Sequence, residues 1–379
     1  MTAPKIRFKE FSENWGSKKI IELADYVDYR GKTPKKVESG VLLVTAKNIK
    51  QGYLDYSASQ EFIEESAFDD VMRRGKVELN DVLITTEAPL GNVASVDRTD
   101  IALAQRVIKY RGKTGLLDNL FLKQKFLSES FQEILKSKAT GGTVQGIKGS
   151  VLHQIPLIVP SKEEQTKIAT FLSAVDEKIS QLSQKLHLLG QYKQGMMQKL
   201  FSQQIRFKAN DGSEFGDWEI LKFKDVITIK YGKDHKKLKD GDIPVLGTGG
   251  IMRYVDSYLY DGESILIGRK GTIDKPQFIS GKFWTVDTLF YTEIGEKIRP
   301  KFAFQQLLLV NWLNLNEATG VPSLNTTSIG NIELKVPCLE EQTKIANFLS
   351  AIDQKIEVVA QQIEQAKQWK KGLLQQMFV

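Results

Sequence analysis

The sequence predicts an α+β protein built as a pseudo-twofold internal repeat, in which two globular α/β domains are separated by two long antiparallel coiled-coil helices. Three observations lead to this fold class. One block of sequence recurs almost unchanged, each copy of the block carries a heptad pattern, and the sequence between the copies contains short apolar runs typical of strands. The 379 residues also exceed what a single hydrophobic core usually organises.

The repeat is clearest in segment 163–179, which recurs at 340–356 with three changes. The same offset of 177 residues (340 − 163) aligns 155–160 with 332–337 upstream, and no gap is needed further along the helix. A repeat of this length and fidelity indicates a duplicated structural unit.

A second match pairs Ile6-Arg7-Phe8-Lys9 with Ile205-Arg206-Phe207-Lys208. In the first copy the helical block runs on into this short segment, whereas the second copy ends soon after its helix. We therefore expect Met377-Phe378-Val379 to lie beside Ile6-Arg7-Phe8-Lys9, which would close the repeats into a ring.

Apolar residues at alternating steps of four and three form a heptad seam in each copy. Two matched lysines, Lys193 and Lys370, interrupt the seams; each is either a polar residue that fixes register or a local skip of the heptad. The seams comprise Ile168, Leu172, Val175, Ile179, Leu182 and Leu186 in the first copy, and Ile345, Leu349, Ile352, Ile356, Val359 and Ile363 in the second.

Each helix is expected to begin after a proline, at Pro160 and Pro337, where a Glu-Glu pair suits the positive end of the helix dipole. A helix of roughly 38 residues would be a rod of about 57 Å, which favours two rods packed antiparallel. The alternative is that each seam packs on its own domain. The predicted boundaries are 1–160 for the first domain, 161–204 for the first helix, 205–337 for the second domain and 338–379 for the second helix.

Both variable segments have the mixed pattern of an α+β domain. In the first, strands are predicted at Val41–Val44, Val82–Thr85 and Gln105–Ile108, and a helix at Leu120–Ser137. In the second, strands are predicted at Ile243–Leu246, Ser264–Ile267 and Leu289–Tyr291, and a helix at Phe302–Glu317.

The net charge of +7 favours a polyanionic partner only weakly, so local clusters matter more. Basic, aromatic and glycine-containing loops are candidate contacts to DNA phosphates and base edges, although each could also be a solvated surface. The candidate DNA-binding residues are Arg30, Lys32, Thr33, Lys47, Thr86, Glu87, Gln105, Arg106, Lys233, His235, Lys236, Arg253, Arg269, Lys270 and Thr272.

The motifs of several catalytic classes are missing from the sequence. It contains no Gly-x-x-x-x-Gly-Lys-Ser/Thr phosphate loop and no Pro-Pro pair, which an amino-methyltransferase box requires. Its three histidines lie far apart and its one cysteine is Cys338, so no His/Cys zinc cluster is expected. The pair Asp176-Glu177 is interpreted as solvated. We therefore predict no catalytic residue, no bound metal and no cofactor on this chain.

The block Glu163-Glu164-Gln165-Thr166-Lys167-Ile168-Ala169 and its copy at 340–346 resemble the conserved helices of type I restriction-modification specificity subunits, and the resemblance covers the whole chain. Segments 30–34, 86–92 and 269–272 look like parts of that family's two target-recognition domains. The resemblance implies that each domain reads one half of a bipartite, asymmetric sequence in double-stranded DNA. Half-sites on one face of the duplex would lie about one helical turn, ~34 Å, apart.

In that family the helices dock two methyltransferase subunits, and two restriction subunits join them; S-adenosylmethionine, ATP and Mg²⁺ are then expected on these partners. One alternative is the specificity subunit of a related, type IIB-like system whose partner fuses methylation and cleavage. Another is a coiled-coil adaptor that does not bind DNA. The N-terminus has no signal-peptide pattern and no apolar run is long enough to span a bilayer, so we expect a cytoplasmic protein without membrane contact.

Overall fold

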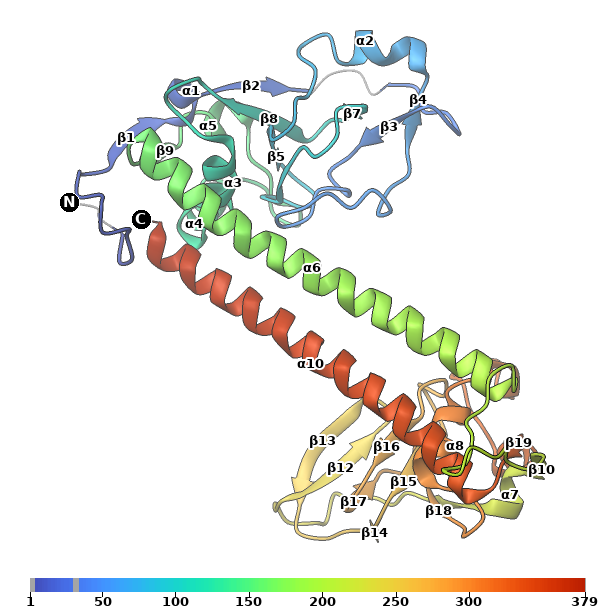
Figure 1. Ribbon diagram of the computed structural model, residues 1–379. Helices are drawn as coiled ribbons and strands as arrows, with labels where there is room; N and C mark the ends of the chain where they lie inside the picture. The colour runs from blue at the N-terminus through green and yellow to red at the C-terminus, as the bar shows by residue number, and fades with distance from the viewer. Residues whose placement is uncertain (1–3, 30–33, 379) are drawn as a thin grey trace. The chain divides into compact units, whose positions relative to one another are not determined.

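The computed structural model describes residues 4–29 and 34–378. The chain divides into two compact units, one formed by Met1–Ser183 with Gln361–Val379 and the other by Gln184–Ala360. Each unit combines a globular domain with part of both long helices (Figure 1). The mixture of sheets and helices confirms the predicted α+β class.

The first domain alternates short strands with short helices. Its elements are β1 (Gly16–Lys19), α1 (Ile20–Leu23), β2 (Ala24–Asp28), β3 (Val41–Val44), β4 (Phe62–Ile63), η1 (Glu65–Ala67), α2 (Phe68–Val71), β5 (Val82–Thr85), β6 (Val93–Ser95), β7 (Ile101–Leu103), β8 (Val107–Gly112), α3 (Asn119–Leu127), α4 (Glu129–Ser137), α5 (Gly149–Leu152) and β9 (Pro156–Val159).

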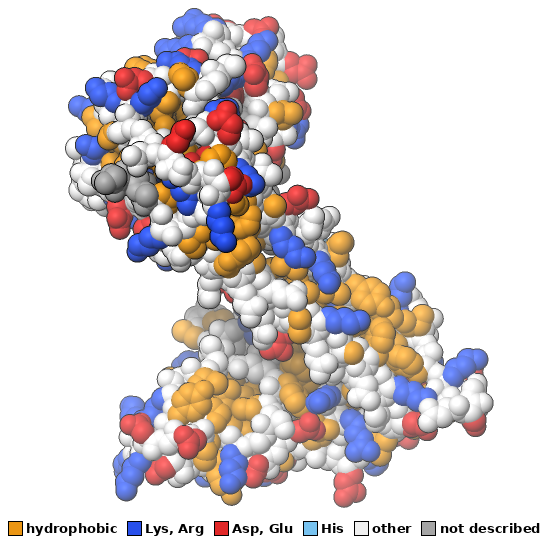
Figure 2. Space-filling view, turned by 60° about the vertical axis from the view of Figure 1, so that its left-hand side comes forward, with side chains coloured by type: hydrophobic (Ala, Val, Ile, Leu, Met, Phe, Trp, Pro, Cys, Tyr) orange, Lys and Arg blue, Asp and Glu red, His pale blue; other side chains and the backbone are white. Residues whose placement is uncertain are grey.

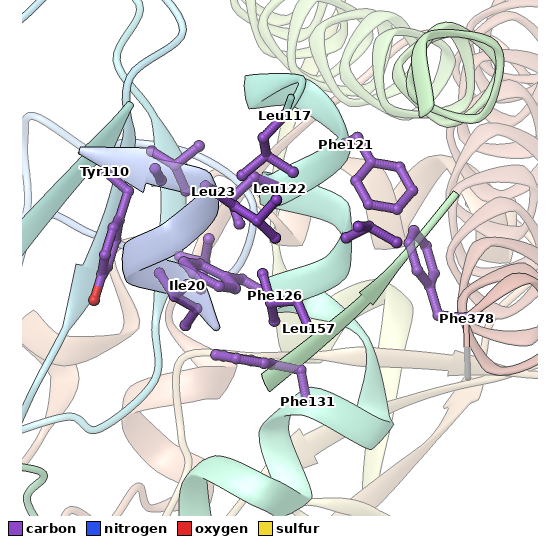
Figure 3. Packing of buried hydrophobic residues seen from close by; sticks show 14 of the residues in the cluster. Ile20, Leu23, Tyr110, Leu117, Phe121, Leu122, Phe126, Phe131, Leu157 and Phe378 are labelled. Carbon is purple, nitrogen blue, oxygen red and sulfur yellow. The ribbon is translucent and has the colours of Figure 1, made fainter. Parts of the chain in front are cut away.

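The strands of the first domain form a four-stranded sheet of order β2-β8-β5-β6, a three-stranded sheet of order β4-β3-β7, and the pair β1-β9. Strand β5 is buried throughout, and its side chains alternate between two cores. Val82 and Ile84 pack into the cluster that contains α3, whereas Leu83 packs into the cluster beneath β3 and β7. Figure 3 shows Phe121 and Phe126 of α3 within the first of these clusters.

The second domain repeats this plan with sheets of order β11-β18-β15-β16 and β13-β12-β17-β14, and the pair β10-β19. Its elements are β10 (Glu219–Lys222), α7 (Phe223–Val226), β11 (Ile227–Tyr231), β12 (Ile243–Gly247), β13 (Gly250–Val255), β14 (Tyr260–Asp261), β15 (Ser264–Gly268), β16 (Gln277–Ile279), β17 (Lys282–Thr285), β18 (Leu289–Ile294), α8 (Pro300–Leu307), η2 (Trp312–Leu315), α9 (Thr326–Gly330) and β19 (Glu333–Val336).

The two long helices are α6 (Lys162–Phe201) and α10 (Leu339–Met377). In the first unit the start of α6 packs against the end of α10, where the rings of Phe171 and Trp369 are 6.0 Å apart. In the second unit the end of α6 shares a core with the start of α10. The pairing in each unit is thus antiparallel, as predicted, and the twelve predicted seam residues are all buried or half-buried.

The alternative prediction, in which each heptad seam packs on its own domain, is also partly right. Ile168 and Leu172 of α6 lie in the same buried cluster as Phe121 of the first domain, and Leu373 of α10 joins them. The apolar side of the helix therefore contacts its own domain and the other long helix together.

The two seam lysines make matched ion pairs across the helices. Lys370 Nζ lies 2.5 Å from Asp176 Oδ1, and Lys193 Nζ lies 2.6 Å from Asp353 Oδ1. The lysines are thus polar residues within the seam. The interpretation of Asp176 as solvated is wrong, because its carboxylate also accepts a hydrogen bond from Gln124 and its side chain is only 26% exposed.

The expected contact between the chain ends is confirmed for the described residues. Ile6 N donates to Gln376 O at 3.0 Å. Phe378 is buried against Phe121 of α3, with ring centroids 5.4 Å apart (Figure 3). Val379 lies outside the described residues.

The repeated Glu-Glu-Gln motif fastens each helix to its domain. The buried carboxylate of Glu164 accepts two hydrogen bonds from Arg7, and that of Glu341 accepts two from Arg206. In the first copy the Gln165 side chain accepts from one backbone amide and donates to two carbonyls, and its counterpart in the second copy makes the same three kinds of bond.

Three predicted elements are wrong in extent. The helix expected over 120–137 breaks at Ser128, which has extended backbone and caps α4 by accepting a hydrogen bond from Phe131 N. The helix expected over 302–317 occupies Pro300–Leu307 and is followed by the short helix η2. The strand expected from residue 105 begins at Val107, because Arg106 has φ +70° and cannot extend it.

Candidate nucleic-acid interface

The strand order of the first domain gathers several loops at one end of its sheets. The start of β8 pairs with the ends of both β2 and β5, and β3 runs parallel to β7. The segments that follow these strands must therefore meet. We call residues 45–48, 86–87 and 104–106 the first loop edge; the candidates Arg30, Lys32 and Thr33 follow β2 and lie outside the described residues.

The first loop edge brings four predicted residues together. Thr86 N donates to Arg106 O at 2.9 Å, and Glu87 Oε1 lies 2.7 Å from Arg106 Nε. These two segments border a hollow of about 290 Å³. Its lining residues are Thr86, Glu87, Gln105, Arg106, Thr140, Val144, Gly146, Ile147 and Lys148.

Lys47 belongs to the same edge. Its side chain is exposed in the turn after β3, and the neighbouring Asn48 is buried. Asn48 accepts from Thr45 N and donates to the carbonyls of Asp55 and Ser59, so it fixes the turn that carries the lysine.

The second domain has an equivalent edge. The start of β18 pairs with the ends of β11 and β15, and β12 runs parallel to β17. We call residues 232–236, 248–250, 269–272 and 286–288 the second loop edge. Backbone hydrogen bonds tie its segments together, from Lys233 N to Thr285 O and from Arg269 N to Thr288 O.

A hollow of about 790 Å³ opens at the second loop edge and contains two predicted residues, His235 and Lys236. Lys233 lies in the same segment and is exposed. The lining residues are Asp234, His235, Lys236, Gly247, Thr248, Gly249, Gly250, Ile251, Met252, Val286, Asp287 and Thr288.

The basic loop after β15 lies next to this hollow. The guanidinium of Arg269 donates to Asp287 O and lies 5.5 Å from the ring centre of Tyr231. Lys270 N donates to Thr288 O, and Thr272 follows in the same loop. Two cationic residues in this loop therefore contact Asp287 and Thr288, which line the hollow.

Arg253 is engaged within its own domain. Its Nη2 donates to Leu238 O at 3.1 Å and to Asp240 Oδ1 at 2.8 Å. These bonds connect β13 with the loop before β12. Its role as a DNA contact stays a prediction.

The sequence interpretation missed several residues that the topology places at the second loop edge. Thr248, Asp287 and Thr288 line its hollow but were not candidates. They belong to no run of positive charge, the pattern that marks basic candidates such as Lys233 and Arg269. Only the structure identifies them: Thr288, for example, occupies the position of Arg106 in the hydrogen-bonded framework, a correspondence that the divergent sequences of the two domains do not display.

Charge on the surface is mixed. Figure 2 shows Lys and Arg side chains interspersed with Asp and Glu over the visible face. Among the described residues, no group of three His, Cys, Asp or Glu side chains could hold a metal ion. No helix within the described ranges is long and apolar enough to cross a membrane.

A family model described as the type I restriction modification DNA specificity domain matches residues 12–189 and 216–368. The chain belongs to this family. The two matched segments reproduce the internal repeat, so this specificity subunit contains two copies of the family domain. Its two loop edges lie within the two matches, one in each.

Named relatives agree with this assignment. The type I restriction enzyme MjaVIII specificity subunit of Methanocaldococcus jannaschii is 26% identical over 415 residues, which cover 96% of this chain and 91% of that protein. The EcoprrI specificity subunit of Escherichia coli is 23% identical over 342 residues, which cover 81% of this chain and 85% of that protein.

Solved structures show that the fold is shared. The S subunit of a type I restriction-modification system from M. genitalium has a TM-score of 0.69 at 19% identity, covering 100% of this chain and 99% of that one. A chain from a structural study of complex assembly and conformational transition in the type I R-M system has a TM-score of 0.53 at 14% identity, covering 96% and 97%.

Proposed function

We propose that each loop edge of this specificity subunit reads one half of a bipartite, asymmetric target in double-stranded DNA. The observation that carries the proposal is that the two domains share one strand framework but place different side chains at the same loops. Positions 86 and 87 are Thr and Glu in the first domain, whereas the equivalent residues are Arg269 and Lys270. Unlike side chains on a common scaffold are expected to select different base sequences.

We further propose that two methyltransferase subunits and two restriction subunits assemble with the chain in the cytoplasm, and that the chain itself is not catalytic. The sequence lacks a phosphate loop and an amino-methyltransferase box, which supports placing ATP, Mg²⁺ and S-adenosylmethionine on the partners. The predicted seam residues are buried or half-buried, whereas other faces of both long helices carry exposed side chains, which supports docking of the partners on the helices.

The test is selection from a random duplex library by the complex of this chain with its methyltransferase partner. The expected result is a motif with two unlike defined halves separated by an undefined spacer. A library that shows no enriched split motif would contradict DNA reading. Methylation or cleavage of DNA by the isolated chain would contradict the non-catalytic assignment.

Removing cations from the second loop edge tests the site. Lys233→Ala and Arg269→Ala should each weaken binding and reduce the slope of log affinity against log salt by about one, if each contacts a phosphate. Lys301→Ala is the matched control, because this exposed lysine is the second residue of α8. That helix follows the end of β18 opposite to the loop edge. Unchanged affinity in both loop variants would place the contact surface elsewhere in the domain.

A further inference from the structure

Both domains contain the same backbone junction at their loop edges. In the first, Thr86 N donates to Arg106 O, and Ile147 N donates to Thr86 O. In the second, Arg269 N donates to Thr288 O, and Leu324 N donates to Arg269 O. The residues after Thr86 and Arg269 also form matched bridges, Glu87 with Gly146 and Lys270 with Ser323.

The polar side chains at this junction differ between the domains, whereas the buried Ile147 and Leu324 are similar. The first carries the acid–base pair Glu87 and Arg106, and the equivalent positions of the second are Lys270 and Thr288. A structural requirement of the junction would be met by similar residues in both copies, as it is for the buried Arg–Glu pairs at the helix starts. The divergence is therefore the pattern expected of residues that read DNA.

The first junction is shaped to hold Glu87 against Arg106. Arg106 adopts φ +70°, a left-handed conformation that is unfavourable for arginine and is typical of functional sites. Glycine at position 146 leaves room for the glutamate, because a Cβ there would lie 3.2 Å from Glu87 Cβ and 3.5 Å from its Oε2. Both charged side chains nevertheless remain about half exposed, at 42% and 55%.

The ion pair engages the guanidinium of Arg106 at its Nε, and the side chain is 55% exposed. The atom of Arg106 that faces the carboxylate is Nε, 2.7 Å from Glu87 Oε1. An arginine held in this way keeps its two terminal nitrogens as a donor pair, which matches O6 and N7 of guanine in the major groove. The adjacent carboxylate makes the pair electrically neutral and would repel a phosphate, so a base edge is the better match.

We propose that Arg106 is the specificity-determining residue for a guanine in the half-site read by the first domain, and that Glu87 is a positioning residue that fixes the plane of its guanidinium. This inference rests on the proposed function and adds to it the base and the two residues involved. The second domain, with Lys270 and Thr288 at these positions, reads its half-site without such a pair.

The experiment repeats the library selection with Arg106→Ala, Arg106→Lys and Glu87→Gln, each in complex with the methyltransferase partner. Arg106→Ala should lower discrimination at one G·C position of one half-site by about 5- to 150-fold, the range of a bidentate base contact. Arg106→Lys should retain the charge and lose most of that discrimination. The other half-site should be unchanged in both variants and serves as an internal check of folding.

Glu87→Gln separates positioning from a merely structural role. It should reduce discrimination at the same G·C position, because the guanidinium is no longer fixed. Non-specific binding should at the same time become tighter and more dependent on salt, because a negative charge is removed from the DNA side. A structural role would instead weaken binding to all sequences together.

Arg98→Ala is the matched control, since Arg98 forms an exposed pair with Asp100 before the start of β7, at the other end of that strand from the loop edge. The outcomes are distinguishable. No split motif with the unaltered chain would contradict the proposed function. Two outcomes would overturn this inference and leave the proposed function intact. In one, Arg106→Lys changes discrimination at no G·C position of the split motif. In the other, it weakens discrimination equally at every position.

Discussion

At the scale of single residues, buried ion pairs fasten the helices to the domains. Glu341 is fully buried and accepts two hydrogen bonds from Arg206 and one from Trp218 Nε1. A carboxylate in such a position is stable only with its partners, because an unpaired buried charge is costly. Arg206 therefore contributes more to the stability of the second unit than its partly exposed position implies.

Arg206→Met should lower the free energy of unfolding of the second unit by about 2–4 kcal/mol, because it leaves Glu341 buried without a counter-ion. Urea denaturation followed by tryptophan fluorescence measures this, since Trp218 touches the same carboxylate. The control is Arg73→Met, which removes an exposed pair with Asp70 and should change stability by less than about 0.5 kcal/mol. If the two substitutions lowered the free energy of unfolding equally, the buried Arg206–Glu341 pair would be no more stabilising than an exposed one.

The Asp176 carboxylate gives the first unit a dependence on pH. Burial raises the pKa of Asp176, but the positive charges of Lys370 and Lys123 lower it by more. The pKa therefore lies below the ordinary value of 3.8. Gln124 donates to the same carboxylate. A folded-state pKa below the unfolded value stabilises the fold above about pH 4, and this stabilisation is lost as the pH falls through the folded value.

Asp176→Asn should therefore reduce the loss of stability of the first unit between pH 5 and pH 2, and should destabilise it at pH 7 by leaving Lys370 without its counter-ion. Thermal unfolding measured from pH 2 to pH 7 tests both effects. Glu177→Gln, on the exposed side of the same helix, is the control and should change neither. An unaltered pH profile in Asp176→Asn would show that the ion pair does not control acid stability.

Residue-scale contacts were the hardest to predict. The Arg7–Glu164 pair joins residues 157 positions apart, and no local pattern links them. Both members do recur in the second copy, as Arg206 and Glu341, and this joint recurrence was the available signal. The sequence around Asp176 has the pattern of a solvated acidic pair, because the neighbouring Glu177 is exposed. The ion pair with Lys370 comes from the other helix and leaves no local signal.

At the scale of elements, periodic segments were predictable and irregular ones were not. The heptads placed both long helices to within a few residues, because a seam repeated over several turns has few alternative structures. The break at Ser128 and the left-handed Arg106 depend on tertiary contacts that periodicity does not contain. The sequence identifies the candidates at 86–87 and 105–106 one by one. It does not predict that the two segments contact each other, because that depends on the order of the strands in the sheet.

The ion pairs of the two seam lysines should contribute more to the free energy of unfolding than ion pairs on the surface do. A double-mutant cycle of Lys193→Met and Asp353→Asn is expected to give a coupling of about 1–2 kcal/mol, because the Lys193 side chain is only 14% exposed. The same cycle on Lys367 and Glu364, an exposed pair one turn apart on α10, should give about 0.3 kcal/mol. A coupling at Lys193 no larger than this would show that the seam pair contributes little.

At the scale of the whole molecule, the end of each long helix completes a core. Phe378 after α10 packs against Phe121 of α3, and Phe201 at the end of α6 packs against Phe302 of α8. Phe201 and Phe378 occupy matched positions in the repeat, since 378 − 201 = 177. The repeat predicts that the chain ends meet. It does not predict that Phe378 is buried, because the two variable domains have diverged in sequence and their common core cannot be recognised from it.

Phe378→Ala should lower the stability of the first unit by about 3–5 kcal/mol and leave the second unchanged. Native-state hydrogen exchange measures the two separately, through amides of α3 and of α8. Phe201→Ala is the matched counterpart and should show the reverse selectivity. Equal loss of protection in both units would contradict independent cores.

The division of the chain into units has a consequence for synthesis on the ribosome. The second unit is one continuous stretch, Gln184–Ala360, whereas the core of the first unit includes Leu373, Met377 and Phe378, which follow that stretch in the sequence. The domain made first therefore needs residues that are translated after the whole second unit, and it can reach its full stability only once they have emerged. A nascent chain that stops early would present a finished second domain beside a first domain whose apolar core is still open.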